Sequence, residues 1–203
     1  MALFVERGYA RTTVGDIAER AGLTERTFFR YFSDKREVLF SGSKELENSI
    51  VDAVKNAPPD VAPLEAVANA MAAAGAALQE YRELAQVRAR FAFVVEHAEV
   101  RERELIKMAS MAAAVTEALR SRGVVESEAS LVAELGITVF KLGFERWVNS
   151  GKKRPLSLAQ HIRATVDTLK NIAADGMAAS ETMRTAERGV ARSARSHAPA
   201  SKL

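Results

Sequence analysis

Two arginines near the start of the chain have a spacing that suits contact with nucleic acid. Arg26 and Arg30 lie four residues apart in the segment ERTFFRYF, so a helix presents both on one face. The aromatic residues Phe28, Tyr31 and Phe32 are then expected to pack inward. Because guanidinium groups pair with phosphates and with the edge of guanine, we expect this helix to contact DNA through its cationic face.

A second short helix is expected just before this one, where it positions the cationic face. Thr13 is a suitable N-cap, and Asp16 three residues later completes a start like a capping box. Gly22 permits the left-handed backbone that ends a helix, and Thr24 caps the helix that follows. A helix, a glycine turn and a second helix with exposed cations form the helix-turn-helix pattern, whose second helix enters the DNA major groove.

The joint spacing of these and neighbouring residues resembles the DNA-binding domain of TetR-type repressors. The resemblance covers roughly the first fifth of the chain and is carried by Leu3-Phe4, Gly8-Tyr9, Thr12-Thr13-Val14, Ile17-Ala18, Ala21-Gly22-Leu23, Phe28-Phe29, Phe32 and Ser33-Asp34-Lys35. It implies a regulator of transcription whose third helix binds DNA. The residues assigned to DNA binding by pattern and resemblance are Thr13, Gly15, Thr24, Glu25, Arg26, Thr27, Phe29, Arg30, Tyr31 and Lys35.

Two departures from the family pattern affect this hypothesis. The family usually has a tyrosine at the place of Phe29, where the hydroxyl touches a phosphate, and Phe29 cannot donate that hydrogen bond. The family's first helix also begins further upstream, so Met1 falls in the middle of it, as expected if the chain is truncated or its start was assigned late. A helix this short needs tertiary packing, which we expect from Ile17, Phe28 and Phe32.

The residue inventory argues against an enzyme. The chain has no cysteine, which excludes disulfides and thiolate chemistry. Its histidines, His97, His161 and His197, are far apart, and no metal-binding pair, nucleophile motif or phosphate loop is present. We expect His97 to be a solvated helix end, and we expect no metal and no cofactor. No apolar run reaches the ~18 residues of a membrane helix, and no signal peptide opens the chain, so a cytoplasmic protein is predicted.

The charge distribution requires a local patch for DNA attraction. The net charge is +3, and residues 176–203 carry five Lys or Arg against two Glu, so the remainder of the chain is neutral. A global field therefore cannot attract DNA. The cations that could form a patch are Arg11, Arg26, Arg30, Lys35 and Arg36.

The rest of the chain reads as helices, with no strand-like alternation. A bridging helix is expected from the cap at Ser33 or Asp34 to the Pro58-Pro59 pair, with Gly42 tolerated inside it. Apolar stripes with a helical period then predict helices at 63–80, 82–97, 99–122, 126–149 and 156–174. Helices of this length pack as a bundle. The predicted fold is therefore all-α, with an N-terminal three-helix helix-turn-helix domain and a C-terminal helical domain that binds a ligand and dimerises.

Three segments are predicted. Residues 1–45 form the DNA-binding domain, residues 46–175 form the ligand-binding and dimerisation domain, and residues 176–203 form a disordered basic tail. The arginines at 184, 188 and 192 are four apart, so a basic helix is the alternative for the tail.

Two further sets of residues are assigned to ligand and to partner subunit. Met and aromatic side chains adapt to apolar guests, and the candidates for the ligand site are Met71, Phe91, Val94, Met108, Met111 and Trp147. One recognition helix offers few base contacts, so a palindromic operator and a homodimer are expected. The candidates for the dimer interface are Phe140, Phe144, Ile162 and Leu169.

The predicted function is a ligand-responsive repressor that a small apolar effector releases from double-stranded DNA. Within the family, the spelling TFFRYF and the stretch YRELAQVRARF resemble members whose suggested ligands are acyl-CoA-like. The alternative is a helical ligand-binding or interaction module that has lost DNA binding, which the short first helix and Phe29 would explain.

Overall fold

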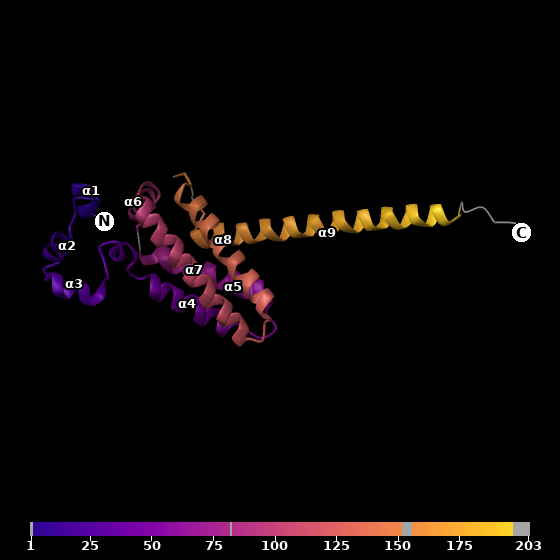
Figure 1. The fold of residues 1–203 in the computed structure, drawn as a ribbon, viewed down its shortest axis with the longest axis horizontal. Coiled ribbons are helices and arrows are strands. Elements are labelled where there is room, and N and C mark those ends of the chain that lie inside the picture. Colours follow the sequence, from indigo (N-terminus) through magenta and orange to yellow (C-terminus); the bar gives the residue numbers. More distant parts are fainter. Residues whose placement is uncertain (1, 82, 152–155, 197–203) are drawn as a thin grey trace, which may run out of the picture. The chain divides into compact units, whose positions relative to one another are not determined.

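The computed structural model describes residues 2–81, 83–151 and 156–196, and over these residues every regular element is a helix (Figure 1). The all-α prediction is confirmed. The elements are α1 (Ala2–Arg7), α2 (Val14–Arg20), α3 (Glu25–Tyr31), the 3-10 helix η1 (Glu37–Phe40), α4 (Ser43–Lys55), α5 (Pro63–Tyr81), α6 (Leu84–Glu96), α7 (Ala98–Ser121), α8 (Glu126–Val148) and α9 (Leu158–Ser196).

The first three helices form the predicted helix-turn-helix, and the expected caps are present. The Thr13 side chain accepts a hydrogen bond from the Asp16 amide at 3.1 Å, and the Asp16 carboxylate accepts one from the Thr13 amide at 2.8 Å. Gly22 has φ of 68°, which ends α2 with a left-handed residue. Thr24 then accepts a hydrogen bond from the Thr27 amide at 3.2 Å and begins α3.

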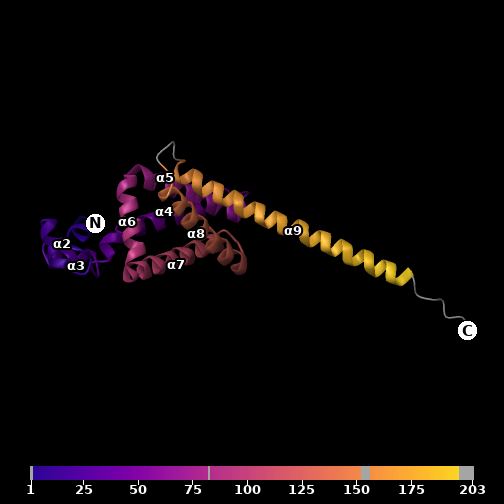
Figure 2. The ribbon, with the colours of Figure 1, turned by 90° about the horizontal axis from the view of Figure 1, so that it is seen from above.

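Helices α4 to α8 pack into a bundle whose core is filled by completely buried side chains. Met71 of α5, Leu119 of α7 and Trp147 of α8 are all at most 2% exposed. Gly136 of α8 allows close approach to α5, because a Cβ there would lie 2.3 Å from Val67 Cγ1. Figure 2 shows α6 crossing the end of this bundle that faces α1, α2 and α3.

The single bridging helix predicted after residue 33 is interrupted. Residues Glu37–Phe40 form the short helix η1, and α4 begins only at Ser43. The cause is Gly42, whose φ of 85° is left-handed and incompatible with an α-helix. The sequence prediction treated Gly42 as a tolerated interior residue and was wrong at this point, so η1 is an element of its own between the helix-turn-helix and the bundle.

The described chain divides into two compact units, residues 1–163 and 164–203, each considered by itself. Helix α9 continues to Ser196, where the sequence analysis expected disorder from residue 176. Alanine and arginine are good helix formers, and the structure follows the alternative of a basic helix over 176–196; residues 197–203 lie outside the described residues. The predicted boundary between residues 45 and 46 remains a prediction. Among the described residues no helix is long and apolar enough to cross a membrane.

Candidate nucleic-acid interface

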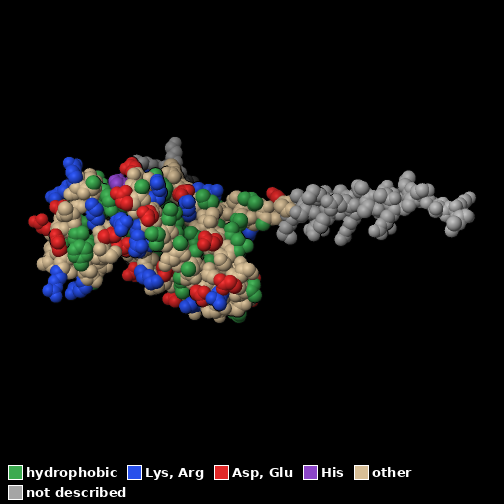
Figure 3. Space-filling model, in the orientation of Figure 1, with side chains coloured by type: hydrophobic (Ala, Val, Ile, Leu, Met, Phe, Trp, Pro, Cys, Tyr) green, Lys and Arg blue, Asp and Glu red, His purple; other side chains and the backbone are tan. Residues whose placement is uncertain are grey.

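The outward face of α3 carries the side chains that the sequence analysis assigned to DNA. Arg26, Phe29 and Arg30 are exposed, and Phe28 on the other side is only 4% exposed. The Arg26 side chain forms no ion pair or hydrogen bond with any described residue. Figure 3 shows basic (blue), acidic (red) and hydrophobic (green) side chains interspersed over the N-terminal domain. The face therefore offers an unpaired cation and an uncovered aromatic ring to an external partner.

Tyr31 does not pack inward as predicted. It is 67% exposed, and its hydroxyl accepts a hydrogen bond from Arg30 Nη2 at 2.9 Å. The Arg30 guanidinium also lies 4.8 Å from the centre of the Tyr31 ring. The inward positions of α3 are filled by Phe28 and Phe32, whose rings are 5.2 Å apart, so the helix has no inward place left for Tyr31.

Helix α3 is held against α2 by small and capping residues. Gly15 lies so close to Glu25 that a Cβ on Gly15 would come within 2.6 Å of the Glu25 carboxylate. The Thr13 hydroxyl donates to Asp16 at 2.7 Å, and hydrogen bonds from the backbone and side chain of Thr13 lower the pKa of Asp16. Thr27 is half-buried and shares a hydroxyl hydrogen bond with Thr24 at 3.1 Å. The contacts of these residues are within the helix-turn-helix, where they fix the position of α3.

Lys35 is bonded inside the protein, whereas the sequence analysis assigned it to DNA binding. Its ammonium donates to the carbonyl of Tyr9 at 2.7 Å and to that of Thr12 at 2.9 Å, and it lies 4.3 Å from the centre of the Tyr9 ring. Two of its three donors are therefore used. Lys35 ties the loop after α3 to the segment between α1 and α2, and the geometry gives it a structural role.

The N-terminal helices rest on α6 through an aromatic cluster. Phe4 and Tyr9 each lie 5.6 Å, centre to centre, from the Phe93 ring. The short helix α1 was expected to lean on Ile17, Phe28 and Phe32; its buried Phe4 belongs to this aromatic cluster, against which Ile17 also packs. The buried members of the cluster are Phe4, Tyr9, Leu39, Phe40, Phe93, Val94 and Val100. We call this contact of α1, its following loop and η1 with α6 and α7 the junction.

His97 and Val94 belong to the junction, and His97 is less exposed than predicted. His97 was expected to be solvated, yet it is half-buried and stacks on Phe93 at 4.0 Å. Its Nδ1 lies 2.9 Å from the Phe93 carbonyl, to which it must donate because a carbonyl only accepts. Val94 was predicted to line a ligand site, but it is 7% exposed within the aromatic cluster.

Charged side chains surround the junction in complementary pairs. Glu37 of η1 pairs with Arg103 and with Lys107 of α7, the latter at 3.3 Å. Arg90 of α6 donates to the Leu39 carbonyl at 2.9 Å and pairs with Glu104 at 2.8 Å. Burial raises the pKa of Glu37, but hydrogen bonds from Arg103 and Lys107 outweigh it and hold this pKa below its ordinary value.

The Phe40 ring lies beneath two of these cations. The Arg90 guanidinium is 5.2 Å and the Lys107 ammonium is 5.5 Å from its centre. A cation over an aromatic face is attracted by the ring quadrupole. The element η1 is thereby held by α6 and α7. A shift of either helix would move η1 and, through the loop that joins them, α3.

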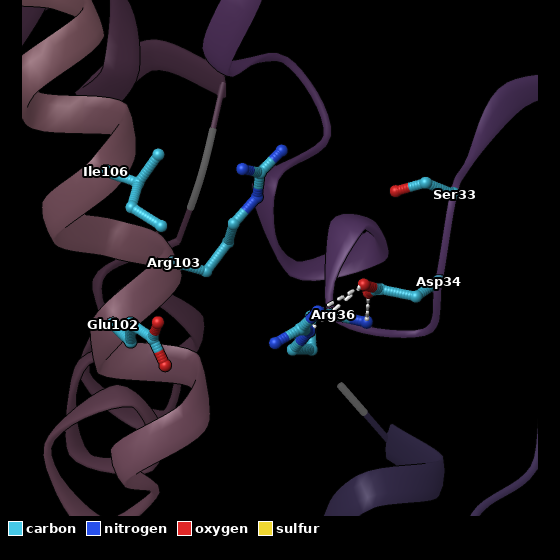
Figure 4. Close-up of a pocket in the computed structure, with 6 residues that line it drawn as sticks. All are labelled: Ser33, Asp34, Arg36, Glu102, Arg103 and Ile106. Carbon is cyan, nitrogen blue, oxygen red and sulfur yellow. Dashed lines mark hydrogen bonds and ion pairs between the residues drawn. The ribbon is translucent and has the colours of Figure 1, made fainter.

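The residues predicted to bind a ligand line neither of the two hollows described below, and their assignment stays a prediction. Met71 and Trp147 are buried in the bundle core, whereas Phe91 of α6 and Met108 and Met111 of α7 are half-buried. A hollow of about 250 Å³ lies between the loop after α3 and α7 (Figure 4), lined by Ser33, Asp34, Arg36, Glu102, Arg103 and Ile106. A second of about 230 Å³, between α4 and α5, is lined by Ala53, Ala57, Pro58, Val61, Ala66, Asn69, Ala70 and Ala73. Neither contains a predicted ligand residue.

The predicted dimer residues differ in their accessibility. Phe140 and Phe144 are half-buried, and their rings stack 6.3 Å apart. Ile162 is completely buried inside its own chain, since Gly143 leaves room for it and a Cβ there would lie 2.9 Å from the Ile162 Cα. Ile162 is therefore a core residue rather than an exposed interface residue. Leu169 lies in the second unit and is half-buried.

The charged residues of the junction were missed by the sequence analysis. Glu37, Arg90 and Arg103 look like ordinary solvated charges on helices, and their partners are far away in the sequence. For Arg90 alone, the sequence contains a sign that the side chain is partly buried, because it lies beside the apolar residues of the 82–97 stripe. Among the described residues no group of three or more His, Asp or Glu is placed to hold a metal ion.

The fold and the exposed face of α3 define a helix-turn-helix protein. Residues 1–41 match the model of the bacterial regulatory proteins of the tetR family. A curated relative, the HTH-type transcriptional regulator TcmR of Streptomyces glaucescens, is 36% identical over 73 residues, which are 36% of this chain and 32% of the relative. The chain thus matches about a third of that relative's length. The N-terminal domain of this chain, residues 1–41, is therefore similar to the DNA-binding domain of the tetR family.

Two solved structures resemble the chain beyond that domain. The crystal structure of Thermus thermophilus FadR, a TetR-family transcriptional repressor in complex with lauroyl-CoA, is 24% identical with a TM-score of 0.51 and covers 83% of this chain and 88% of that one. The TetR-family transcriptional regulator PfmR, also from Thermus thermophilus, is 24% identical as well, with a TM-score of 0.44 over 82% of this chain and 91% of that one. The likeness to FadR supports the helical fold of the C-terminal part.

Proposed function

We propose that this protein is a homodimeric transcriptional regulator that represses its genes by binding a palindromic operator and leaves DNA when a small apolar effector binds. The observation that carries the proposal is the outward face of α3. It holds an unpaired Arg26 and an uncovered Phe29 on the second helix of a tetR-family helix-turn-helix. Side chains kept free of internal partners are available to phosphates and base edges. We place the protein in the cytoplasm with its DNA, and we propose no enzymatic activity.

The proposed division of labour follows the predicted boundary after residue 45. Residues 1–45 bind DNA, and residues 46–175 bind the effector and form the dimer. One recognition helix makes few base contacts, so two copies on half-sites about one helical turn apart are required. Phe140, Phe144 and Leu169 remain the candidates for the interface. Light scattering at micromolar concentration tests this, because a mass near that of one chain, 22.1 kDa, would exclude the dimer.

The junction supports a route from effector to DNA. Helices α6 and α7 hold η1 through Arg90, Arg103 and Lys107, and α6 also carries Phe93, against which α1 rests. An effector that moves α6 or α7 would therefore reposition the helix-turn-helix and change the spacing between the two recognition helices. The effect of the effector need not pass through α4, because η1 and α4 are separate elements on either side of Gly42.

The effector is expected to be largely hydrophobic, with acyl-CoA thioesters as the first class to test. The FadR structure from Thermus thermophilus was solved in complex with lauroyl-CoA, and the residues proposed here to meet an effector, such as Phe91 and Met108, are apolar. The effector must bind the DNA-free form better than the DNA-bound form, since equal affinity would shift nothing. A coupling of ~2 kcal/mol gives tens-fold release, and operator DNA must weaken effector binding by the same factor.

DNA binding is tested by recovering genomic fragments with the purified protein and measuring their affinity. Arg26→Ala should weaken specific binding by about 1–3 kcal/mol if the guanidinium contacts a guanine. Arg120→Ala is the matched control, because Arg120 is an exposed arginine near the far end of α7 that pairs only with acidic neighbours. A protein that recovers no fragment, or an Arg26 variant that binds like the parent, contradicts the proposal and favours an interaction module without DNA binding.

The effector is tested by titrating acyl-CoA thioesters of increasing chain length with and without operator. Phe91→Ala enlarges and Met108→Trp fills the proposed space, and Val125→Ala, at a residue that is 64% exposed, is the control. We expect the Phe91 and Met108 variants to change effector affinity and the control to leave it unchanged. Unchanged affinity in both variants would place the effector elsewhere, and equal affinity with and without operator would exclude induction by release.

A further inference from the structure

Two adjacent phenylalanines of α3 have opposite environments. Phe28 is 4% exposed and packs on Phe32, whereas Phe29 is 55% exposed. Their rings meet edge to face with centres 5.5 Å apart, and this contact leaves Phe29 more than half exposed. Burial of an aromatic side chain is a large source of folding free energy. Phe29 contributes little of it, and its ring remains available to a partner.

The surroundings of Phe29 are cationic. Arg26 lies three residues before it, on the same face of the helix, and Arg30 follows it directly. Arg30 is turned toward Tyr31, with which it forms a hydrogen bond at 2.9 Å, and so leaves the Phe29 ring uncovered. A phenyl ring has no hydrogen-bond donor. Phe29 therefore cannot anchor to a phosphate oxygen, and its contact with a partner must be apolar.

We propose that Phe29 determines sequence specificity by packing against the C5-methyl group of a thymine in each half-site of the operator. This inference rests on the proposed DNA-binding function. In the major groove the thymine methyl is the apolar group among hydrogen-bond donors and acceptors, and phenylalanine is among the side chains that contact it. Arg26 on the same face can read a guanine by hydrogen bonds, so one helix face combines a polar and an apolar reader.

The consequence is a defined pattern in the preferred DNA. Each half-site should contain a thymine close to the base that Arg26 contacts. Removal of that one methyl group should weaken binding as loss of one buried methyl does, by about fourfold in each half-site. Loss of the Phe29 ring should remove the preference for thymine at that position, while the preference set by Arg26 remains.

The experiment replaces thymine by deoxyuridine, which lacks only the methyl group. High-affinity sites are first selected from random duplexes with the full-length protein, and each thymine is then replaced in turn. For the parent protein we expect one symmetric pair of thymines at which replacement by deoxyuridine weakens binding. Replacement in one half-site should weaken it by about fourfold, and replacement in both should weaken it by about tenfold or more. For Phe29→Ala we expect weaker binding overall and equal affinity for thymine and deoxyuridine at that pair.

Tyr31→Ala is the control, because Tyr31 is the other exposed aromatic side chain of α3, and this variant should keep the deoxyuridine effect. Circular dichroism should show that both exposed-site variants remain folded. If the parent binds DNA and Phe29→Ala retains the same loss on deoxyuridine replacement, the inference is wrong while DNA binding stands. Unchanged DNA affinity of Phe29→Ala would also overturn it and point to a protein partner for the ring. If the parent binds no DNA, both the proposed function and this inference fail.

Discussion

The outward face of α3 lies in the N-terminal domain, and the junction joins that domain to α6 and α7; the two regions treat their charges in opposite ways. On α3, Arg26 has no internal partner and Phe29 is more than half exposed. At the junction, Glu37 has two cationic partners and Phe93 is 7% exposed. One face is kept open, and the other is closed by aromatic packing and ion pairs.

The difference shows which residues serve an external partner and which serve the fold. A charge that is desolvated within the chain needs an internal partner, because an unpaired buried charge is costly. A charged side chain that contacts an external partner, by contrast, remains solvated and has no internal partner while that partner is absent. By this criterion Lys35, with two carbonyl acceptors, belongs with the junction rather than with α3. Four substitutions test this division, beginning with the largest expected effect.

Removal of the Phe93 ring should have the largest effect. Phe93→Ala deletes a buried aromatic side chain that contacts Phe4, Tyr9 and His97, so the free energy of unfolding should fall by about 3–5 kcal/mol. Hydrogen exchange should accelerate first in α1. Val95→Ala, at a half-exposed position in the same helix, should change stability by no more than about 0.5 kcal/mol. A Phe93 variant as stable as this control would show that the junction does not support the domain.

Replacement of Lys35 separates a structural from a phosphate-binding lysine. Lys35→Ala leaves the carbonyls of Tyr9 and Thr12 without their donor and should lower the free energy of unfolding by about 2 kcal/mol. The salt dependence of DNA binding should keep its slope. A loss of about one unit in that slope with unchanged stability would instead assign Lys35 to a phosphate, and Lys55→Ala, at an exposed lysine of α4, provides the control for both measurements.

Loss of the Thr24 cap should have a smaller effect that is concentrated in α3. Thr24→Ala leaves the Thr27 amide without its acceptor and should cost about 1 kcal/mol, measured by chemical denaturation. Operator affinity should fall as well, because the seven-residue helix that carries Arg26 frays. Thr24→Asp retains a capping oxygen and should restore stability. Equal losses in the alanine and aspartate variants would mean that the hydroxyl serves another purpose than capping.

The smallest effect is a pH dependence that arises from Glu37. Its pKa lies below the ordinary value of 4.5 in the folded protein, so its ion pairs stabilise the fold at neutral pH. This stabilisation should be lost as the pH falls below that ordinary value and through the lower folded pKa, because the unfolded chain binds the proton more tightly. Glu37→Gln should flatten the acid limb of the stability curve, whereas Glu117→Gln, at an exposed carboxylate of α7, should not. Identical acid limbs for all three proteins would exclude this contribution.

The outward face was largely predictable from the sequence, because its signals are local. Thr13 and Asp16, and Thr24 with its amide partner, act within three residues, and Gly22 acts through its own backbone. Tyr31 was misplaced because helical spacing alone cannot tell how many aromatic rings fit beneath a seven-residue helix. Gly42 was misjudged for a related reason: glycine is permitted both inside a helix and at a left-handed break, and the sequence alone does not tell which of the two occurs.

The junction and the ligand site were much less predictable. Phe4 meets Phe93, and Glu37 meets Arg103, only after the bundle has formed. Neither segment contains a local pattern that predicts which distant residue it will contact. The stripes of α5 to α8 correctly predicted helices, but Met71 and Trp147 are fully buried in them, like ordinary core residues. Periodicity identifies the inward face of a helix. It does not reveal whether neighbouring helices close that face completely or leave space for a guest.

The contact of Phe4 with Phe93 also has a consequence for biosynthesis. The ribosome releases α3 early in translation. The contact between Phe4 of α1 and Phe93 forms only when α6 has left the exit tunnel. A helix of six residues has little stability of its own. The nascent chain therefore passes through a stage in which the residues proposed to contact DNA are present but α1 still lacks its support from α6. On the proposed function, we expect operator binding only after α6 has been synthesised, and not as soon as α3 emerges.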